Sequence, residues 1–227
     1  MHGNSRHITS TQTAAHRQLS AVVERHATSM FRKPIMDFNR AAFDGSVAAW
    51  KTAGAMPLIL DAGCGVGMST RNLALQFPDH FVIGVDQSAD RLARNTHSTG
   101  ATLNNCLLVR ADLVDFWRLM LEAEMHPARH YLLYPNPWPK IGHLGRRWHG
   151  HAVFPTVLAL GGILECRSNW RIYIEEMSSA IHQVTGLDVL CEAFHTAEPI
   201  TPFEQKYLAS RHSLWRCIAD LNLREHR

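Results

Sequence analysis

From residue 57 onward, the chain alternates short apolar runs with longer amphipathic stretches five times. The short runs suit buried strands of a parallel sheet, and the amphipathic stretches suit the helices that connect them. The pattern therefore predicts a Rossmann-like α/β fold with a doubly wound, mostly parallel sheet. The predicted strands are residues 58–62, 81–85, 106–109, 130–134 and 163–166, and the predicted helices are residues 69–76, 88–96, 113–123, 148–160 and 170–184. Residues 187–193 and 214–219 are predicted to add an antiparallel pair.

The N-terminal part of the chain has a different pattern. Apolar residues recur at helical steps over residues 11–50, with an interruption at Pro34. We therefore predict a helical N-terminal extension over residues 1–50 and one α/β domain over residues 51–227. A chain of 227 residues can bury one full core of this kind, and two domains would be cramped.

Several classes of protein are disfavoured by composition. No apolar run approaches the roughly 18 residues that a membrane span needs, and the N-terminus has no apolar signal region. The five cysteines form no C-x-x-C pair, which is typical of a reduced, cytoplasmic protein. Although there are 15 histidines, none stands in a zinc-binding pattern, so no metal is expected.

Ligands of a doubly wound sheet bind at the carboxyl ends of its strands, and three predicted strand ends carry an acid. The first is followed by the loop D-A-G-C-G-V-G, which contains Asp61, Gly63, Gly65 and Gly67. Its spacing matches neither the dinucleotide G-x-G-x-x-G nor a P-loop. Asp86 lies 19 residues after Gly67, a separation typical of an acid that binds ribose hydroxyls, although it could instead cap the next helix. The third acid is Asp112.

Together, D-A-G-C-G-V-G, G-V-D-Q-S and A-D-L resemble the cofactor motifs of class I S-adenosylmethionine-dependent methyltransferases. The resemblance implies that Asp61 and the loop Gly63–Gly67 face the methionine end of the cofactor. It implies that Asp86 binds the ribose and that Asp112 binds the adenine amino group. The residues that follow these two acids, Gln87 and Leu113, complete the predicted cofactor-binding set.

The fourth strand end is the segment P-N-P-W-P-K, residues 135–140. Two prolines restrict the backbone on either side of Asn136, so its side chain should point in a fixed direction. Trp138 offers a face for base stacking, and Lys140, Arg146 and Arg147 could neutralise phosphates. The alternative is a proline-rich loop capped by a core tryptophan, next to a solvated basic surface.

The segment P-N-P-W-P-K-x-x-H-x-x-R-R resembles the signature P-D-P-W-P-K-x-x-H-x-x-R-R of bacterial tRNA (guanine-N7)-methyltransferases. Two further segments, L-G-G-I-L-E-C-R-S-N-W and T-P-F-E-Q-K-Y, are similar to that family, so the resemblance covers residues 57–218. It implies that a substrate guanosine and its phosphates contact Lys140, Asn169, Thr201, Phe203 and Glu204. It also implies tRNA as the partner and Asn136 as the residue that orients the acceptor near the methyl group.

Two positions depart from the family, which has Asp where this chain has Asn136 and Asn169. A carboxylate only accepts hydrogen bonds, whereas an amide also donates them, so the departures bear on which base is recognised. Guanine N7 needs no deprotonation, so methyl transfer itself could survive them. A small heterocyclic acceptor, an exocyclic amino group or an inactive RNA-binding module therefore remain alternatives. We expect no membrane association, and a monomer or a homodimer.

Overall fold

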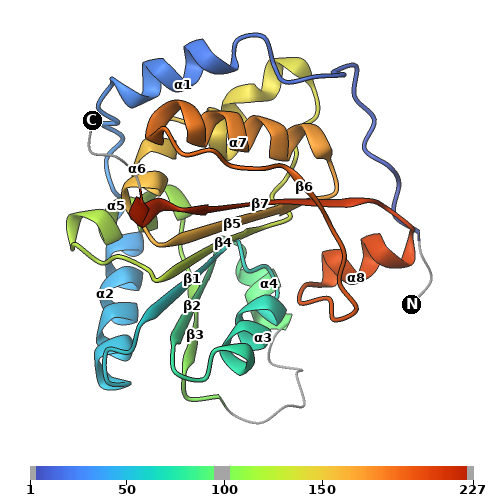
Figure 1. Cartoon of the computed structure of the whole chain (residues 1–227). Helices are drawn as coiled ribbons and strands as arrows, with labels where there is room; N and C mark the ends of the chain where they lie inside the picture. The colour runs from blue at the N-terminus through green and yellow to red at the C-terminus, as the bar shows by residue number, and fades with distance from the viewer. Residues whose placement is uncertain (1–3, 95–102, 224–227) are drawn as a thin grey trace. The chain divides into compact units, whose positions relative to one another are not determined.

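Four parallel strands form the centre of the unit built by residues Lys33–Leu133 (Figure 1). They are β1 (Leu58–Ala62), β2 (Phe81–Asp86), β3 (Cys106–Arg110) and β4 (Arg129–Leu133), in the order β3-β2-β1-β4. Every residue of β1 and β2 is buried, which explains why these strands are apolar runs and not alternating ones. The computed structural model describes residues 4–94 and 103–223.

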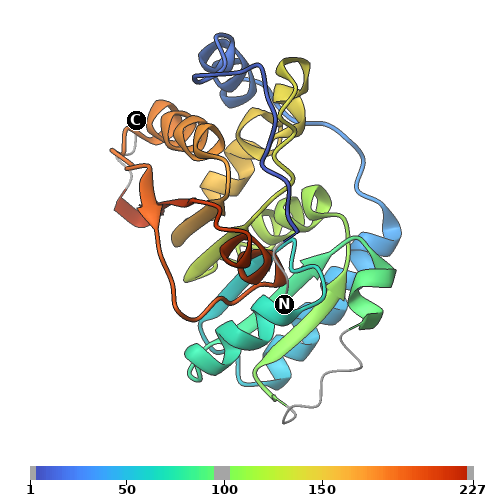
Figure 2. The ribbon, with the colours of Figure 1, turned by 90° about the vertical axis from the view of Figure 1, so that its right-hand side faces the viewer.

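Helices cover both faces of these strands. Figures 1 and 2 show α2 (Asp37–Thr52) and α3 (Met68–Gln76) on opposite sides of them. α2 packs against α5 (Leu113–Glu122), whereas α3 packs against β2 and β3. The helix predicted over residues 88–96 is the short α4 (Ala89–Ala93), and the end of that prediction lies outside the described residues.

The second unit joins the N-terminal residues up to Arg32 with residues 134–227. Its strands are β5 (Ile163–Ser168), β6 (Glu192–Phe194) and β7 (Leu214–Asp220), which are antiparallel in the order β5-β7-β6. The predicted antiparallel pair is confirmed, but its first strand is only three residues long, because residues 187–191 form no strand. Its helices are α1 (Leu19–Ala27), α6 (Phe154–Ala159), α7 (Arg171–Thr185) and α8 (Pro202–Ala209), with 3-10 turns η2 (Ile141–Arg146), η3 (Trp148–Gly150) and η4 (Leu221–Leu223).

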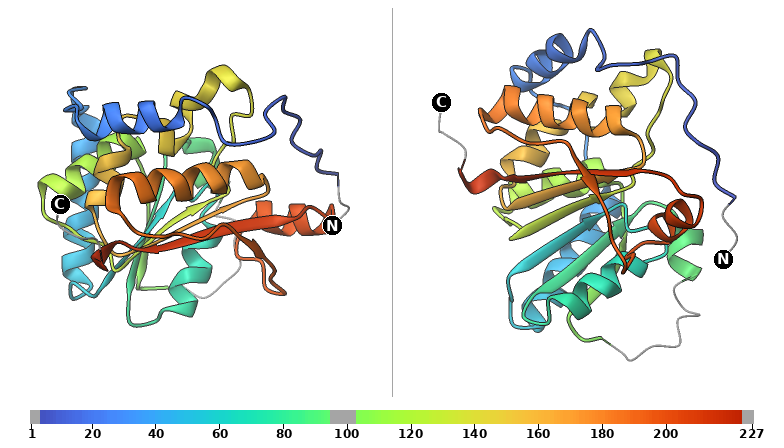
Figure 3. Two further views of the ribbon diagram at one scale, coloured as in Figure 1. Left: turned by 45° about the horizontal axis from the view of Figure 1, so that its top comes forward. Right: turned by 45° about the vertical axis from the view of Figure 1, so that its right-hand side comes forward.

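Two helical predictions need correction here. The helix predicted over residues 148–160 is a 3-10 turn followed by α6, because the chain turns between them with His151 in an extended conformation. The N-terminal helical prediction began at residue 11, but α1 begins at Leu19, and residues 11–18 form bends and a turn. The interruption at Pro34 is confirmed, because Pro34 lies in the sequence between α1 and α2. α1 packs along α7 (Figure 3), whereas α2 belongs to the other unit. The predicted division at residue 50 therefore coincides with neither edge of the two units.

None of the helices in residues 4–94 and 103–223 is long and apolar enough to cross a membrane. Within the same residues, no group of three or more His, Cys, Asp or Glu side chains is placed to hold a metal ion.

Asn39 connects α2 with the start of α5. Its side chain is buried, its Nδ2 donates to Asp115 Oδ2 at 2.6 Å, and its Oδ1 accepts from the backbone nitrogen of Asp112 at 2.9 Å. The carboxylate of Asp115 is fully buried and also accepts from the backbone nitrogen of Met36. Asn39 therefore fixes the end of β3, where Asp112 lies.

We predict that Asn39→Ala lowers the free energy of unfolding by about 2 kcal/mol, because it leaves a buried carboxylate and a partly buried N–H short of a partner. Urea unfolding followed by circular dichroism measures this change. The control is Asn4→Ala, which alters an exposed asparagine. Equal stability of the two variants would contradict the role given to Asn39.

Candidate active site

The glycine loop after β1 adopts backbone conformations that other residues rarely take. Gly63, Gly65 and Gly67 have φ angles of 83°, 59° and 78°. A Cβ atom on Gly67 would also lie 2.5 Å from the side chain of Leu108. A Cβ on Gly65 would meet no described atom within 4 Å, so this part of the loop faces open space. The loop can therefore bring its backbone close to a ligand.

The helix that follows the loop leaves its first turn open to a ligand. α3 begins at Met68 after Gly67, and no side chain caps it in the described structure. The N–H groups at a helix N-terminus attract anions, because they lack intrahelical partners and lie at the positive end of the helix dipole. The glycine loop and α3 together fit the carboxylate of an amino-acid moiety.

Asp61 connects the strand before this loop with the helix after it. It is buried, and its Oδ2 accepts hydrogen bonds from Ser69 Oγ at 2.6 Å and Thr70 Oγ1 at 2.7 Å. Burial raises its pKa to about 6, although the two hydroxyl donors act in the opposite direction. The side chain therefore ties β1 to α3, and it supports the predicted methionine end through the backbone that it positions.

Asp86 holds the other side of the loop. Its Oδ2 accepts from the backbone nitrogen of Gly65 at 3.0 Å, and its Oδ1 accepts from that of Ser88 at 2.8 Å. The helix-cap alternative for Asp86 does not apply, because Ser88 is the residue whose side chain caps α4. An ionised carboxylate has about four acceptor positions, so Asp86 keeps capacity for ribose hydroxyls. The neighbouring Gln87 is exposed.

Asp112 combines a helix cap with partial exposure. Its Oδ1 accepts from the backbone nitrogen of Val114 at 2.8 Å, which caps α5. Its Oδ2 lies 3.6 Å from Lys33 Nζ, and about a third of the side chain is exposed. Leu113 is half-buried, and its Cδ1 would lie 3.9 Å from a Cβ built on Gly63. All of the predicted cofactor-binding residues lie in the unit Lys33–Leu133.

The predicted acceptor residues lie in the other unit, beginning with the proline-rich loop after Tyr134. Tyr134 and Trp138 have positive φ angles of 53° and 45°, which non-glycine residues rarely adopt. Asn136 is exposed between them, and its Oδ1 accepts from the backbone nitrogen of Trp138 at 3.3 Å. This contact leaves the Nδ2 group of Asn136 to donate outward.

Arg147 is not exposed, as a phosphate-binding residue would need to be. Its side chain is fully buried, and its Nη1 donates to Glu176 Oε2 at 2.5 Å. Its Nε and Nη2 donate to the carbonyl of Trp138 at 3.3 and 3.1 Å. The sequence predicted a phosphate contact for Arg147, but in this structure its guanidinium faces inward and holds the acceptor loop. This assignment is therefore corrected to a positioning role.

Glu176 is the centre of the buried network around Arg147. Burial alone would raise its pKa, but the hydrogen bonds and charges of His149 and Arg147 outweigh burial and lower the pKa to about 2. His149 Nε2 lies 2.8 Å from Glu176 Oε2. The carboxylate therefore stays ionised at neutral pH, as the partner of a permanently charged guanidinium requires.

The other two predicted phosphate-binding residues are exposed, as such a role requires. Lys140 ends the proline-rich loop, and Arg146 lies at the end of η2. The guanidinium carbon of Arg146 lies 4.8 Å from the ring centre of Trp138, in a cation–π contact. An indole and two exposed cations thus lie on the segment that also carries Asn136.

The residues around α8 divide into supporting and outward-facing side chains. Thr201 caps α8 through the backbone nitrogen of Glu204, at 2.9 Å. The buried Glu204 accepts from Tyr134 Oη at 2.7 Å and from Arg167 Nη1 at 3.0 Å. These contacts link α8 to β5 and to the start of the acceptor loop, so Thr201 and Glu204 act as positioning residues in this conformation.

Asn169 and Phe203 remain available for a ligand. Asn169 is half-buried, and its Nδ2 lies 3.1 Å from His212 Nδ1. The ring of Phe203 is 48% exposed and stacks on Tyr207, with 6.1 Å between the ring centres. An exposed ring that packs with one face on another aromatic ring is a suitable stacking partner for a base.

Sequence reasoning missed the part that the N-terminal segment plays. Figure 1 shows this segment running from α1 to the neighbourhood of α8. Ser10 Oγ donates to the carbonyl of Pro139 at 2.6 Å, and Gln12 Oε1 accepts from Arg147 Nη2 at 3.0 Å. Near α8, His7 stacks on His212 with 4.1 Å between ring centres. These polar residues carry no periodicity or motif, so no signal in one sequence could have found them.

Comparisons with known proteins decide the family. A family model described as "Putative methyltransferase" matches residues 55–217, which is more than half of the chain. The chain belongs to this methyltransferase family. The predicted resemblance to methyltransferases is therefore confirmed.

Curated relatives of this methyltransferase include several tRNA (guanine-N(7)-)-methyltransferases. The protein from Paraburkholderia xenovorans is 25% identical over 173 residues, covering 71% of this chain and 65% of the relative. The one from Aromatoleum aromaticum is 25% identical over 217 residues, covering 88% and 79%. The one from Acinetobacter baylyi is 27% identical over 167 residues, covering 70% and 67%. The chain thus spans less than two thirds of the length of the Paraburkholderia relative.

Solved structures confirm the fold of the methyltransferase. An antibiotic-related methyltransferase matches with a TM-score of 0.53 at 14% identity, covering 86% of this chain and 98% of the other. A variant of a 16S rRNA (adenine(1408)-N(1))-methyltransferase from Catenulisporales acidiphilia, solved with its cosubstrate SAM, matches with a TM-score of 0.50 at 19% identity, covering 76% and 90%. At such low identity these matches establish the fold alone, which is the predicted Rossmann-like α/β fold.

We predict that Asp86→Ala weakens the binding of S-adenosylmethionine about 30-fold, because it removes a charged acceptor and frees the glycine loop, at a cost of about 2 kcal/mol. Isothermal titration calorimetry measures this affinity. The control is Asp90→Ala, which removes the same charge from an exposed position on α4. Unchanged affinity in Asp86→Ala would contradict the placement of the cofactor.

Proposed function

We propose that this methyltransferase transfers a methyl group from S-adenosylmethionine to N7 of guanine in tRNA. The observation that carries the proposal is the segment after Tyr134. There an exposed amide, Asn136, lies on the same chain segment, residues 135–146, as a half-buried indole and two exposed cations. The curated relatives carry the name of this activity, which supports the choice of guanine N7 as the acceptor.

The residues of the unit Lys33–Leu133 would hold the cofactor. The open N-terminus of α3 and the loop Gly63–Gly67 would bind its carboxylate, and Asp86 would accept from the ribose hydroxyls. The partly exposed carboxylate of Asp112 would accept from the adenine amino group. The bound cofactor supplies an electrophilic methyl group on a positively charged sulfur.

The acceptor unit would bind and orient the base. Guanine N7 would accept the methyl group with its in-plane lone pair, and the electron pair of the former sulfur–methyl bond would stay with the leaving cofactor product. No proton leaves the base in this step, so the chain needs no general base and contributes alignment. The outward Nδ2 of Asn136 would donate to guanine O6, and its Oδ1 keeps a lone pair for the N1–H donor.

Lys140 and Arg146 would neutralise the phosphates beside the reacting nucleotide, and Phe203 would stack on a base. Asn169, Thr201 and Glu204 would complete the acceptor pocket, Asn169 by direct contact and the other two through the positions they give to α8. A second candidate function keeps the cofactor but uses a small heterocyclic acceptor. The amides Asn136 and Asn169, in place of the carboxylates of the resembled family, favour it.

We predict that the protein forms 7-methylguanosine in unmodified tRNA, and that Asn136→Ala lowers kcat/KM about 100-fold, since misalignment of the base is costly. Incubation with labelled S-adenosylmethionine, digestion and mass spectrometry of the nucleosides measures this product. Asn136→Asp is the conservative control, because a carboxylate of the same size keeps the acceptor for N1–H, and we expect it to retain activity.

If calorimetry shows that the protein binds the cofactor but no methylated nucleoside forms in tRNA, the proposal is contradicted. A methylated small heterocycle under the same conditions would establish the second candidate function. Cofactor and RNA binding with no product from either substrate would identify an inactive binding module.

A further inference from the structure

An open groove of about 470 Å³ lies between α1 and the chain segment that follows the acceptor loop. Both walls belong to the unit formed by the N-terminal residues and residues 134–227. Its volume is in the range of small-ligand sites. The lining residues are His16, Arg17, Gln18, Val22, Arg25, His26, Ile141, Gly142, Leu144, Gly145, Gly150, His151 and Ala152.

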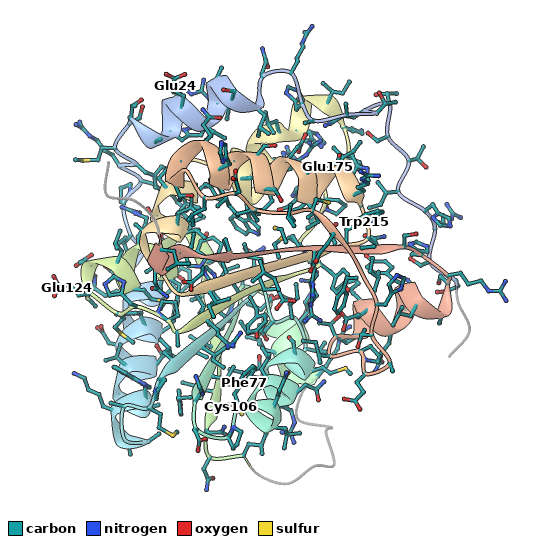
Figure 4. All side chains as sticks on the ribbon, viewed as in Figure 1. Glu24, Phe77, Cys106, Glu124, Glu175 and Trp215 are labelled. Atoms are coloured by element: carbon teal, nitrogen blue, oxygen red, sulfur yellow. The ribbon has the colours of Figure 1, made fainter. Side chains whose placement is uncertain are left out.

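The groove is basic. Two arginines and three histidines line it, and no aspartate or glutamate does. Arg17 and Arg25 are exposed, and neither takes part in the ion pairs found among the described residues. The acid of α1, Glu24, is not among the lining residues, and Figure 4 shows its side chain on the side of α1 that faces away from α7. The positive charge of the groove is therefore left for an external anion.

Three of the residues that line the second wall of the groove are glycines, which place no side chain in it. A Cβ on Gly142 would meet no described atom within 4 Å, so nothing in the fold requires a glycine there for space. Gly150 differs, because a Cβ on it would collide with the carbonyl group of Leu144. Gly150 thus lets η2 and η3 pack closely, whereas Gly142 leaves open space beside the backbone, as the close approach of a ligand needs.

The groove continues from the acceptor loop along the chain. η2 begins directly after Lys140 and ends at Arg146, and Ile141, Gly142 and Gly145 of η2 line the groove. On the opposite wall, Arg17 lies in the turn just before Leu19, the first residue of α1, and Arg25 lies in the last turn of this nine-residue helix, which is roughly 13 Å long. Cations at such a separation suit successive groups of a chain-like polyanion better than one small anion.

We propose that this groove binds backbone phosphates of the tRNA next to the nucleotide that is methylated, with Arg17 and Arg25 as the contacts. This inference rests on the proposed function, because it takes tRNA as the substrate. It adds to that function a phosphate-binding site outside the acceptor loop, built by a helix that precedes the methyltransferase core in sequence.

The decisive experiment measures the salt dependence of tRNA binding by the full chain carrying Arg17→Gln and Arg25→Gln. The slope of log K against log salt is negative, and each lost phosphate contact makes it shallower by roughly 0.7–0.9. The double variant should therefore have a slope smaller in magnitude by about 1.5 and bind roughly tenfold more weakly at about 0.1 M salt. The control is the double variant Arg171→Gln and Arg216→Gln, which removes the same charge outside the groove. These two arginines are exposed to 62% and 32% and pair with Glu175 and Glu192.

A second pair of variants tests the groove without removing an arginine. Gly142→Glu places a carboxylate in the open space, and Gly142→Gln places a neutral group of the same shape there. We expect Gly142→Glu to weaken tRNA binding several-fold relative to Gly142→Gln. Circular dichroism of each variant confirms that it is folded.

The proposed phosphate binding by the groove would be overturned if the groove and control double variants had equal slopes and affinities and the two Gly142 variants did not differ. The formation of 7-methylguanosine by the wild-type protein is measured on the same tRNA. Product without any groove effect would overturn the groove and leave the proposed function intact. A groove effect on binding without product would support the groove and reject the proposed function.

Discussion

The buried ion pair between Arg147 and Glu176 is the interaction on which the acceptor unit depends. The guanidinium joins the carboxylate to the carbonyl of Trp138, and Gln12 closes the network by contacting both charged groups. Breaking a buried pair of this kind by removing one partner costs about 3–5 kcal/mol, because the other charge is left without compensation. The buried guanidinium of Arg147 therefore stabilises the unusual backbone of the acceptor loop, which has a positive φ angle at Trp138.

This arrangement gives the two adjacent arginines different roles. Arg146 faces outward over the ring of Trp138, whereas Arg147 fixes the backbone beneath the same residue. One arginine can thus meet a phosphate while the other sets the direction in which Asn136 points. The cofactor unit has a similar division, since Asp61 holds α3 from within and the glycine loop presents its backbone outward.

The sequence predicted the strands, the glycine loop and the acids at the strand ends, because each depends on local signals. Short apolar runs identify strands that are buried on both faces, and closely spaced glycines identify a turn with positive φ angles. The family resemblance implied the roles of these residues, which stay predictions. The family comparison confirmed the resemblance to methyltransferases over residues 55–217.

The sequence could not predict that Arg147 is buried. Its partners Glu176 and Gln12 lie 29 and 135 residues away, and an arginine in a basic stretch is normally solvated. The same limit applies to Glu204, whose carboxylate meets Tyr134 at a distance of 70 residues in sequence. Contacts of this kind arise from tertiary packing. Neither the residue type of Arg147 nor the family resemblance that implied a substrate contact for Glu204 could reveal them.

The most direct test of this account compares Arg146→Gln and Arg147→Gln for both stability and tRNA affinity. We predict that Arg147→Gln lowers the free energy of unfolding by about 3–5 kcal/mol, and that Arg146→Gln changes it by no more than about 0.5 kcal/mol while weakening tRNA binding. If Arg147→Gln were as stable as the wild-type protein and lost only tRNA affinity, Arg147 would be a phosphate-binding residue after all, and the central role given to the buried ion pair would be wrong.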